Sequence, residues 1–105
     1  MGHRIYVPGG LTATASRLPT LQCYDMVAGR WVSDCAPMAV ARDRHGVAAL
    51  QGELWVVGGW SRVVGGGAAS LTASVEVYNP RLNTWHLGVP LPHACADAGC
   101  VVVQC

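Results

Sequence analysis

The sequence predicts an all-β protein built from copies of one four-stranded antiparallel unit, and three observations lead to that fold class. Of its 105 residues, 51% are hydrophobic and only 12% are charged, so the chain should fold around a core rather than remain disordered. Short runs of β-branched and aromatic residues alternate with glycine, proline and asparagine, which is typical of strands joined by tight turns. The chain also matches itself at a separation of about 50 residues, a period typical of repeat architectures.

The internal repeat is clearest in two pairs of aromatic residues. Tyr24 and Trp31 are seven residues apart, as are Tyr78 and Trp85, and each residue of one pair lies 54 residues from its counterpart. Two further segments align at separations of 49 and 53 residues, respectively 5–10 with 54–59 and 45–51 with 98–104. One structural unit has therefore been duplicated.

The strands of each unit follow in order from the apolar runs and the turn residues that bound them. They are expected at 4–7, 21–24 and 31–33 in the first unit, at 47–50, 54–57, 75–78 and 84–87 in the second, and at 100–103. The connections at 51–53 and 79–83 are of hairpin length, so neighbouring strands should be antiparallel. Residues 47–50 are all apolar, which indicates a strand buried on both faces, as in stacked sheets. The units should therefore stack as the blades of a β-propeller.

The second unit carries a more specific pattern. Residues 44–50 read Arg-His-Gly-Val-Ala-Ala-Leu, Gly58 and Gly59 close the next strand, and Tyr78 and Trp85 follow. With these residues the chain resembles the Kelch family of β-propellers, and the resemblance covers nearly the whole chain. We interpret the repeat positions as structural, because glycine tolerates positive φ and large rings fill the space between blades. These positions are Gly9, Gly10, Tyr24, Trp31, Gly46, Gly58, Gly59, Tyr78 and Trp85.

The resemblance implies an incomplete β-propeller made of antiparallel four-stranded Kelch blades. Residues 1–41 would form a Kelch repeat without its innermost strand, residues 42–92 a complete repeat, and residues 93–105 the first strand of a further repeat. Propellers usually close with four to eight blades, so further Kelch blades are needed in cis or in trans. The chain is either a fragment of a longer Kelch protein, which we favour, or it assembles with other chains. Alone it should be marginally stable or self-associating, because strand edges and sheet faces are uncovered.

Long loops gather at one end of the predicted blades. Because strands alternate in direction, the loops at 11–21, 37–44, 60–73 and 91–97 should share one surface, and binding sites are commonly formed by such loops. Arginine and tryptophan are enriched where binding energy concentrates. The candidate partner-binding residues are Arg44, Arg42, Arg62, Trp60, Ser61 and Arg17. Arg44 matches the arginine that enters the innermost Kelch strand, and the alternative for it is a surface ion pair with Asp43 or Asp97. The expected partner is a protein or peptide segment that is acidic or polar.

Several other classes of function lack support in the sequence. The net charge of +1 gives no electrostatic basis for a nucleic-acid partner, and no apolar segment is long enough to span a membrane, so no membrane partner is expected. The five cysteines form no CxxC pair, so no metal site and no cofactor are expected. No nucleophile and base occur in a catalytic pattern, so no catalytic residue is assigned and the protein is not expected to be an enzyme. Without a signal peptide, a cytoplasmic location is expected.

The resemblance also implies two kinds of function. Many Kelch propellers are the substrate-recognition part of BTB-Kelch adaptors for cullin ubiquitin ligases, so the leading hypothesis is a protein-protein interaction module of that kind. The alternative is an actin-binding or cytoskeletal scaffold, since other Kelch proteins bind actin. Some propellers that resemble Kelch proteins are copper oxidases, and this third hypothesis is the weakest.

Overall fold

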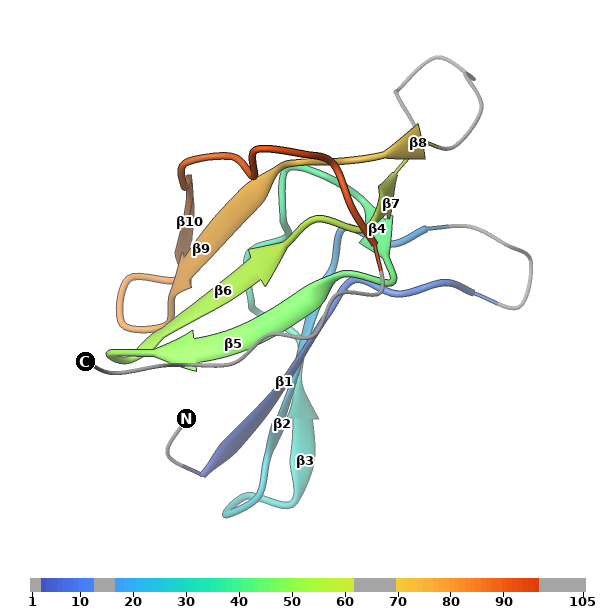
Figure 1. Ribbon diagram of the computed structural model, residues 1–105. Coiled ribbons are helices and arrows are strands. Elements are labelled where there is room, and N and C mark those ends of the chain that lie inside the picture. The colour runs from blue at the N-terminus through green and yellow to red at the C-terminus, as the bar shows by residue number, and fades with distance from the viewer. Residues whose placement is uncertain (1–2, 13–16, 62–69, 97–105) are drawn as a thin grey trace.

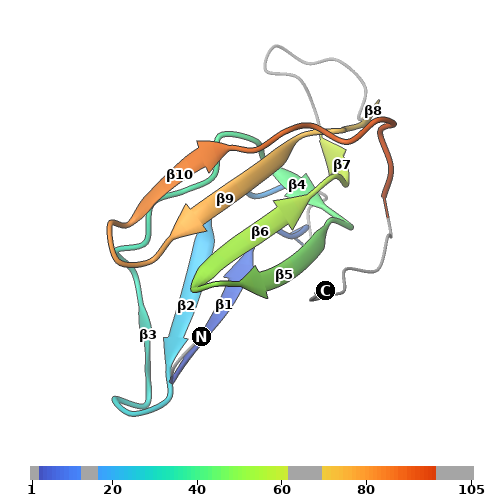
Figure 2. The ribbon, with the colours of Figure 1, turned by 60° about the vertical axis from the view of Figure 1, so that its left-hand side comes forward.

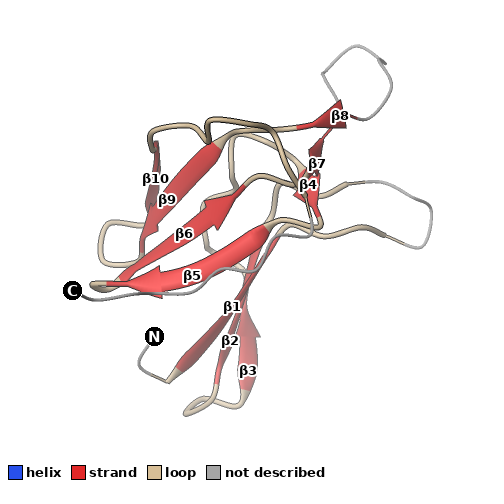
Figure 3. Cartoon of the chain, in the orientation of Figure 1, coloured by secondary structure: helices blue, strands red, loops and turns tan. Residues whose placement is uncertain are grey.

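The protein is formed from β-strands. The computed structural model describes residues 3–12, 17–61 and 70–96, and within these ranges it contains strands and turns but no helix (Figures 1 and 3). In the same ranges there is accordingly no helix of the length and apolarity needed to cross a membrane. The predicted all-β fold class is therefore confirmed, while the strand expected at 100–103 lies outside the described residues.

The first unit forms a three-stranded antiparallel sheet in the order β1-β2-β3. Its strands are β1 (Arg4–Pro8), β2 (Leu21–Asp25) and β3 (Arg30–Val32), close to the predicted bounds. Asp25 closes the turn between β2 and β3, because its Oδ1 accepts the backbone N–H groups of Val27 and Ala28 at 3.0 and 3.1 Å. Such an aspartate turn stops one strand and starts the next without help from other parts of the fold.

The second unit forms a four-stranded antiparallel sheet in the order β10-β9-β6-β5. Its strands are β5 (Gly46–Leu50), β6 (Glu53–Val57), β9 (Val75–Asn79) and β10 (Thr84–Leu87). Asn79 repeats the role of Asp25, since its Oδ1 accepts the backbone N–H groups of Arg81 and Leu82 at 3.0 and 3.3 Å. The two units therefore share their turn chemistry as well as their strand order.

A third, small sheet joins the loops at one end of the molecule (Figure 1). It consists of β4 (Arg42–Asp43), β7 (Trp60–Ser61) and β8 (Ser70–Leu71) in the order β4-β7-β8. Each of these strands has only two residues. Such short strands show no alternation of apolar and polar residues, which explains why sequence patterns did not predict them.

The core lies between the two larger sheets, which Figure 2 shows side by side. It contains Leu21, Met38, Leu54, Val56 and Tyr78, with Tyr6, Cys35 and Trp85 packed against it. These residues come from both units and from the segment between them, so each unit supplies part of the other's cover. The packing of one sheet on the next is the arrangement that the repeat predicted.

The expectation that the strand at 47–50 is buried on both faces is wrong for this structure. Val47 is 37% exposed, and Ala49 is also exposed. The strand, β5, is at an edge of its sheet. Val47 and Ala49 lie opposite Val56 and Leu54, on the face that carries the core, so the cover of that face does not extend to this edge. Apolar residues exposed at the edge of a sheet offer a surface on which another part of a larger assembly can pack.

Candidate functional site

The segment that joins the two larger sheets, residues 33–41, is fixed to the second sheet by a buried carboxylate. Glu76 lies on the interior strand β9 and is 1% exposed. Its Oε1 accepts the Ala39 N–H at 2.7 Å, and its Oε2 accepts the Val40 N–H at 3.2 Å. A buried carboxylate needs such donors to replace the water that it loses. These bonds therefore hold the joining segment in one position on the sheet.

Arg42 completes the same buried network. Its side chain is fully buried, and its Nη2 donates to Oε2 of Glu76 at 2.6 Å and to Oγ of Ser74 at 3.1 Å. Its Nη1 donates to the carbonyl oxygens of Gly58 and Ser74 at 3.0 and 2.9 Å. The guanidinium therefore ties the entry of the second unit to the ends of β6 and β9.

This placement of Arg42 differs from our expectation. We expected Arg42 on the partner-binding surface, whereas the structure encloses it and directs its guanidinium to groups of the chain itself. The physical reason is Glu76, because a buried carboxylate without a compensating charge is costly, and Nη2 of Arg42 lies 2.6 Å from its Oε2. Arg42 is thus a structural residue in the described part of the chain.

Loops from both units meet at the end of the molecule where β4 pairs with β7. Trp60 lies opposite Asp43 in this pairing, and Ser61 lies opposite Arg42. Leu11, Arg17, Asp43, Arg44 and Trp60 line a pocket of about 250 Å³ there, which we call the loop pocket. The structure therefore brings together three of the predicted binding residues, Arg17, Arg44 and Trp60, with Ser61 next to them.

The two arginines of the loop pocket differ in their partners. Nε of Arg17 donates to Oδ1 of Asp43 at 2.6 Å, and both side chains are largely buried, so this pair contributes little net charge. Arg44 is exposed, and among the described carboxylates none pairs with it. Its backbone φ of 55° lies in the left-handed region, just before strand β5 begins. The positive charge of the described pocket is therefore carried by Arg44, while Arg62 lies outside the described residues.

Two glycines allow the backbone to approach β4 closely beside the loop pocket. Gly59 has a φ of 104°, and a Cβ at this position would lie 2.6 Å from the carbonyl oxygen of Asp43. Gly9 has a φ of 66°, and its Cβ would lie 2.5 Å from the carbonyl oxygen of Arg42. An alanine would be strained at both positions. Of the other predicted glycines, Gly10 and Gly58 also have positive φ, and Gly46 is buried at the start of β5.

The aromatic pairs of the two units lie in different surroundings. In both pairs the rings are in contact, with centroids 5.2 Å apart for Tyr24 and Trp31 and 5.0 Å apart for Tyr78 and Trp85. Tyr78 is 2% exposed and lies between the sheets, whereas Trp31 is 59% exposed. Tyr78 also touches the ring of Tyr6 on β1, with centroids 5.9 Å apart. The second pair therefore packs between the units, and the first pair faces outward.

Asn83 adds polar contacts that the sequence did not indicate. Its Oδ1 accepts the hydroxyl of Tyr78 at 2.6 Å and the N–H of Ala36 at 2.8 Å, and its Nδ2 donates to the carbonyl of Asp34 at 2.8 Å. Burial raises the pKa of Tyr78, so the hydroxyl keeps the proton that it donates. Asn83 has a φ of 51°, and the equivalent residue of the first unit is Gly29, with a φ of 66°. The role of the Asn83 amide depends on the joining segment, residues 33–41, whose backbone supplies two of its partners.

His45, which follows Arg44 beside the loop pocket, should make the folding stability of the chain depend on pH. Burial is the main cause that lowers its pKa from 6.5, and a hydrogen bond to the Pro8 carbonyl opposes this only in part. The unfolded chain therefore takes up a proton near pH 6.5 before the folded chain does, so folding stability should fall as the pH is lowered below about 6.5. Urea unfolding between about pH 7 and pH 5 should show this loss in wild type and a smaller loss in His45→Gln. Identical pH dependence in the two proteins would contradict it.

The described cysteines are buried or partly buried. Cys23 is fully buried, and Cys35 and Cys95 are partly buried, all three as free thiols. Burial raises the pKa of the Cys35 thiol, which keeps it protonated. Within the described ranges, no three His, Cys, Asp or Glu side chains gather in a way that could hold a metal ion.

Comparison with known proteins identifies the repeat. The family model described as the Kelch motif matches residues 41–92. Kelch-like protein 25 of Homo sapiens is 36% identical over 104 residues, which cover 96% of this chain and 18% of that protein. The chain belongs to the Kelch-repeat family. Kelch-like protein 23 of Mus musculus is 33% identical over 101 residues, which cover 96% of this Kelch chain and 16% of that protein.

A solved structure agrees with the fold of this Kelch chain. The structure of YjhT superposes on 99% of the chain with a TM-score of 0.81, and the match covers 30% of YjhT. At 23% sequence identity this likeness concerns the fold alone. The Kelch chain thus corresponds to part of a propeller, and it spans less than a fifth of the length of the curated relatives it matches.

Proposed function

We propose that this Kelch module binds a protein partner through the loop pocket and the arginine beside it. The observation that carries the proposal is the difference between the two arginines of the pocket. Arg17 is held by Asp43 at 2.6 Å, whereas Arg44 is exposed beside the half-buried ring of Trp60. An exposed guanidinium next to an indole can form a forked pair with a carboxylate while the indole supplies apolar contact. The partner segment is accordingly acidic or polar.

The proposed class of partner follows from the family. As a Kelch module similar to Kelch-like proteins, the chain would serve in the substrate-recognition part of an adaptor for a cullin ubiquitin ligase. The adaptor would act in the cytoplasm, where the free thiols Cys23, Cys35 and Cys95 stay reduced. An actin-binding or scaffold role is the alternative. Co-purification of the chain from cells separates these roles, because cullin and BTB components indicate the first and actin filaments indicate the second.

The pocket itself is tested by removing one charge. Arg44→Ala should weaken binding of the co-purified partner by about 10- to 150-fold, the range expected for the loss of a charge-assisted hydrogen bond. Calorimetric titration measures the change, and circular dichroism confirms that the variant is folded. The matched control is Arg81→Ala, because Arg81 is an exposed arginine in the turn between β9 and β10, at the end of the sheet away from the loop pocket (Figure 1).

Two results would contradict this proposal. Binding by Arg44→Ala that equals wild type would show that the pocket arginine is not used. Equal losses for Arg44→Ala and Arg81→Ala would show that only the overall charge matters. A charge reversal, Arg44→Glu, should weaken binding further if the partner is acidic, since it replaces an attraction by a repulsion.

A further inference from the structure

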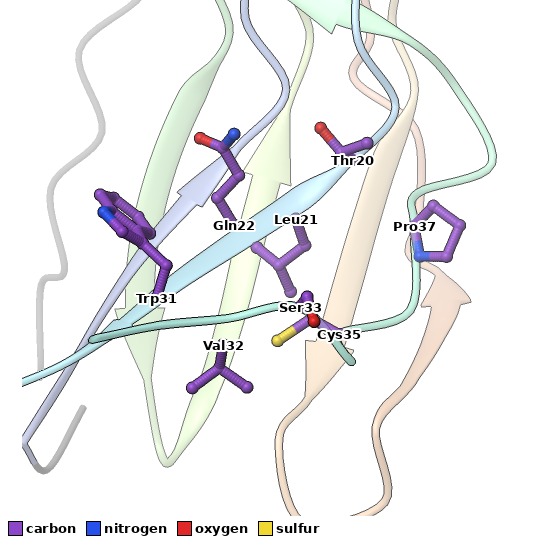
Figure 4. A pocket seen from close by; sticks show the side chains of 8 residues that line it. All are labelled: Thr20, Leu21, Gln22, Trp31, Val32, Ser33, Cys35 and Pro37. Atoms are coloured by element: carbon purple, nitrogen blue, oxygen red, sulfur yellow. The ribbon is translucent and has the colours of Figure 1, made fainter. Parts of the chain in front are cut away.

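One face of the first sheet has no cover among the described residues. Ile5, Tyr24 and Trp31 are neighbours across its three strands, and Ile5 and Trp31 are 49% and 59% exposed. Gln22 lies beside them on β2, and Figure 4 shows it on the same side of the ribbon as Trp31. We call these four residues the open face. A pocket of about 400 Å³ adjoins it, between β2 and the residues that follow β3.

The equivalent face of the second sheet is covered by the same chain. Leu54, Tyr78 and Trp85 are neighbours across its strands, and Leu54 and Tyr78 are only 5% and 2% exposed. Trp85 donates its Nε1 hydrogen to the carbonyl of Ala36 at 2.7 Å, and Glu76 binds the joining segment. A Kelch unit of this chain therefore contains both a face that needs cover and a joining segment that supplies cover.

The segment after the second sheet repeats the joining segment after the first. The repeat is visible in backbone hydrogen bonds whose partners match at separations of 49, 53 or 54 residues. They are Met38 N–H to Pro19 O and Leu91 N–H to Ala73 O, and Gly10 N–H to Arg42 O and Gly59 N–H to Cys95 O. Residues 89–95 thus occupy, after the second unit, the position that residues 36–42 occupy after the first. Within the described residues, this later segment has no further sheet to cover.

We propose that the open face binds residues 89–95 of a second copy of this chain, so that copies associate head to tail. In this arrangement Val89, which is 87% exposed, takes the place of Ala36. Its carbonyl accepts the Nε1 hydrogen of Trp31, as the Ala36 carbonyl accepts that of Trp85 within one chain. The sheet that carries the segment covers Ile5 and Tyr24.

The polar groups at Gln22 favour a second copy over an arbitrary Kelch blade. Glu76, the equivalent residue, has two carboxylate oxygens that accept two backbone N–H groups and the Arg42 guanidinium. Gln22 is neutral and has only one acceptor oxygen. In the later segment the equivalent donors are reduced in the same way, since Pro92 has no N–H, His93 has one, and Cys95 carries no charge. The single acceptor therefore meets a single N–H donor, and neither side buries an unpaired charge.

The symmetry of the association follows from this pairing. The open face and the later segment are different surfaces, so the contact is heterologous and a pair of copies keeps one free surface of each kind. Such contacts continue until a ring closes, and propellers close with four to eight blades. The competing occupant of the open face is a blade from outside this chain, which would leave the isolated chain monomeric.

Introducing a charge at Gln22, which is exposed, or at Cys95, which is partly buried, tests the contact in the intact chain. Sedimentation velocity under reducing conditions should show concentration-dependent association of wild type. Cys95→Arg and Gln22→Glu should each weaken it at least about tenfold, because each leaves a charge in the contact without a partner. The double variant should return to within about threefold of wild type, because it recreates the pair of Arg42 and Glu76 between copies. Circular dichroism confirms that each variant is folded.

A mixing experiment tests the head-to-tail geometry. Trp31→Glu disables the open face and Cys95→Arg disables the later segment, so each variant alone should be monomeric. Their mixture should form a heterodimer, because one intact surface of each kind remains. The proposal is overturned by a wild type that stays monomeric at all accessible concentrations, by a double variant no stronger than the singles, or by a mixture that stays monomeric.

Discussion

Replacement of Glu76 by alanine is expected to lower the free energy of unfolding by about 3–5 kcal/mol, because it leaves the Arg42 guanidinium buried without its partner. It also removes the acceptor of two backbone N–H groups in the joining segment. Domains are commonly stable by about 5–15 kcal/mol, so this loss is a large part of the total. Urea unfolding followed by tryptophan fluorescence measures it.

Two control variants distinguish the effect of the unpaired buried charge from the effect of changing this position of the repeat. Gln22→Ala changes the equivalent residue of the first unit, which is exposed. At high dilution, where copies do not associate, it should alter stability by no more than about 0.5 kcal/mol. The double variant Arg42→Met with Glu76→Met should be more stable than Glu76→Ala, because an apolar pair leaves no buried charge. Equal losses at Gln22 and Glu76, or no recovery in the double variant, would show that the buried pair does not hold the units together.

The strand order could be predicted from the sequence because its signals are local. Asp25 and Asn79 each close a turn with their own following residues, and the strands beside them differ from the predicted bounds by one residue at most. The strands β4 and β7 could not be predicted in this way. Their pairing depends on loops of two units that meet only after the sheets have packed.

The buried pair of Arg42 and Glu76 also depends on contacts between residues far apart in the sequence. Arg42 and Glu76 are 34 residues apart, and no local pattern distinguishes this buried pair from surface charges. A single clue was present, since Glu76 stands between Val75 and Val77 on an interior strand, where a charge requires a partner. By contrast, Arg17, Arg44 and Trp60 were predicted together from their loop positions, their residue types and the Kelch resemblance of Arg44, and the structure brings them to one pocket.

The second large effect concerns Trp31 and Trp85. They occupy equivalent positions in the sequence repeat, but Trp31 is exposed and Trp85 packs against the core. Trp85→Ala is expected to lower the free energy of unfolding by about 3 kcal/mol, since the indole packs against the core and donates to Ala36. Trp31→Ala should cost only about 0.5–1.5 kcal/mol, because Trp31 is 59% exposed and its ring contact with Tyr24 is the main interaction lost.

The comparison is made by urea unfolding at high dilution, so that association of copies does not stabilise Trp31. At higher protein concentration the loss for Trp31→Ala should grow, because in the head-to-tail contact Trp31 acquires the cover that Trp85 already has within the chain. The loss for Trp85→Ala should stay constant, since its partners belong to the same chain. Equal losses for the two variants at high dilution would mean that the faces are covered alike, contrary to their exposures.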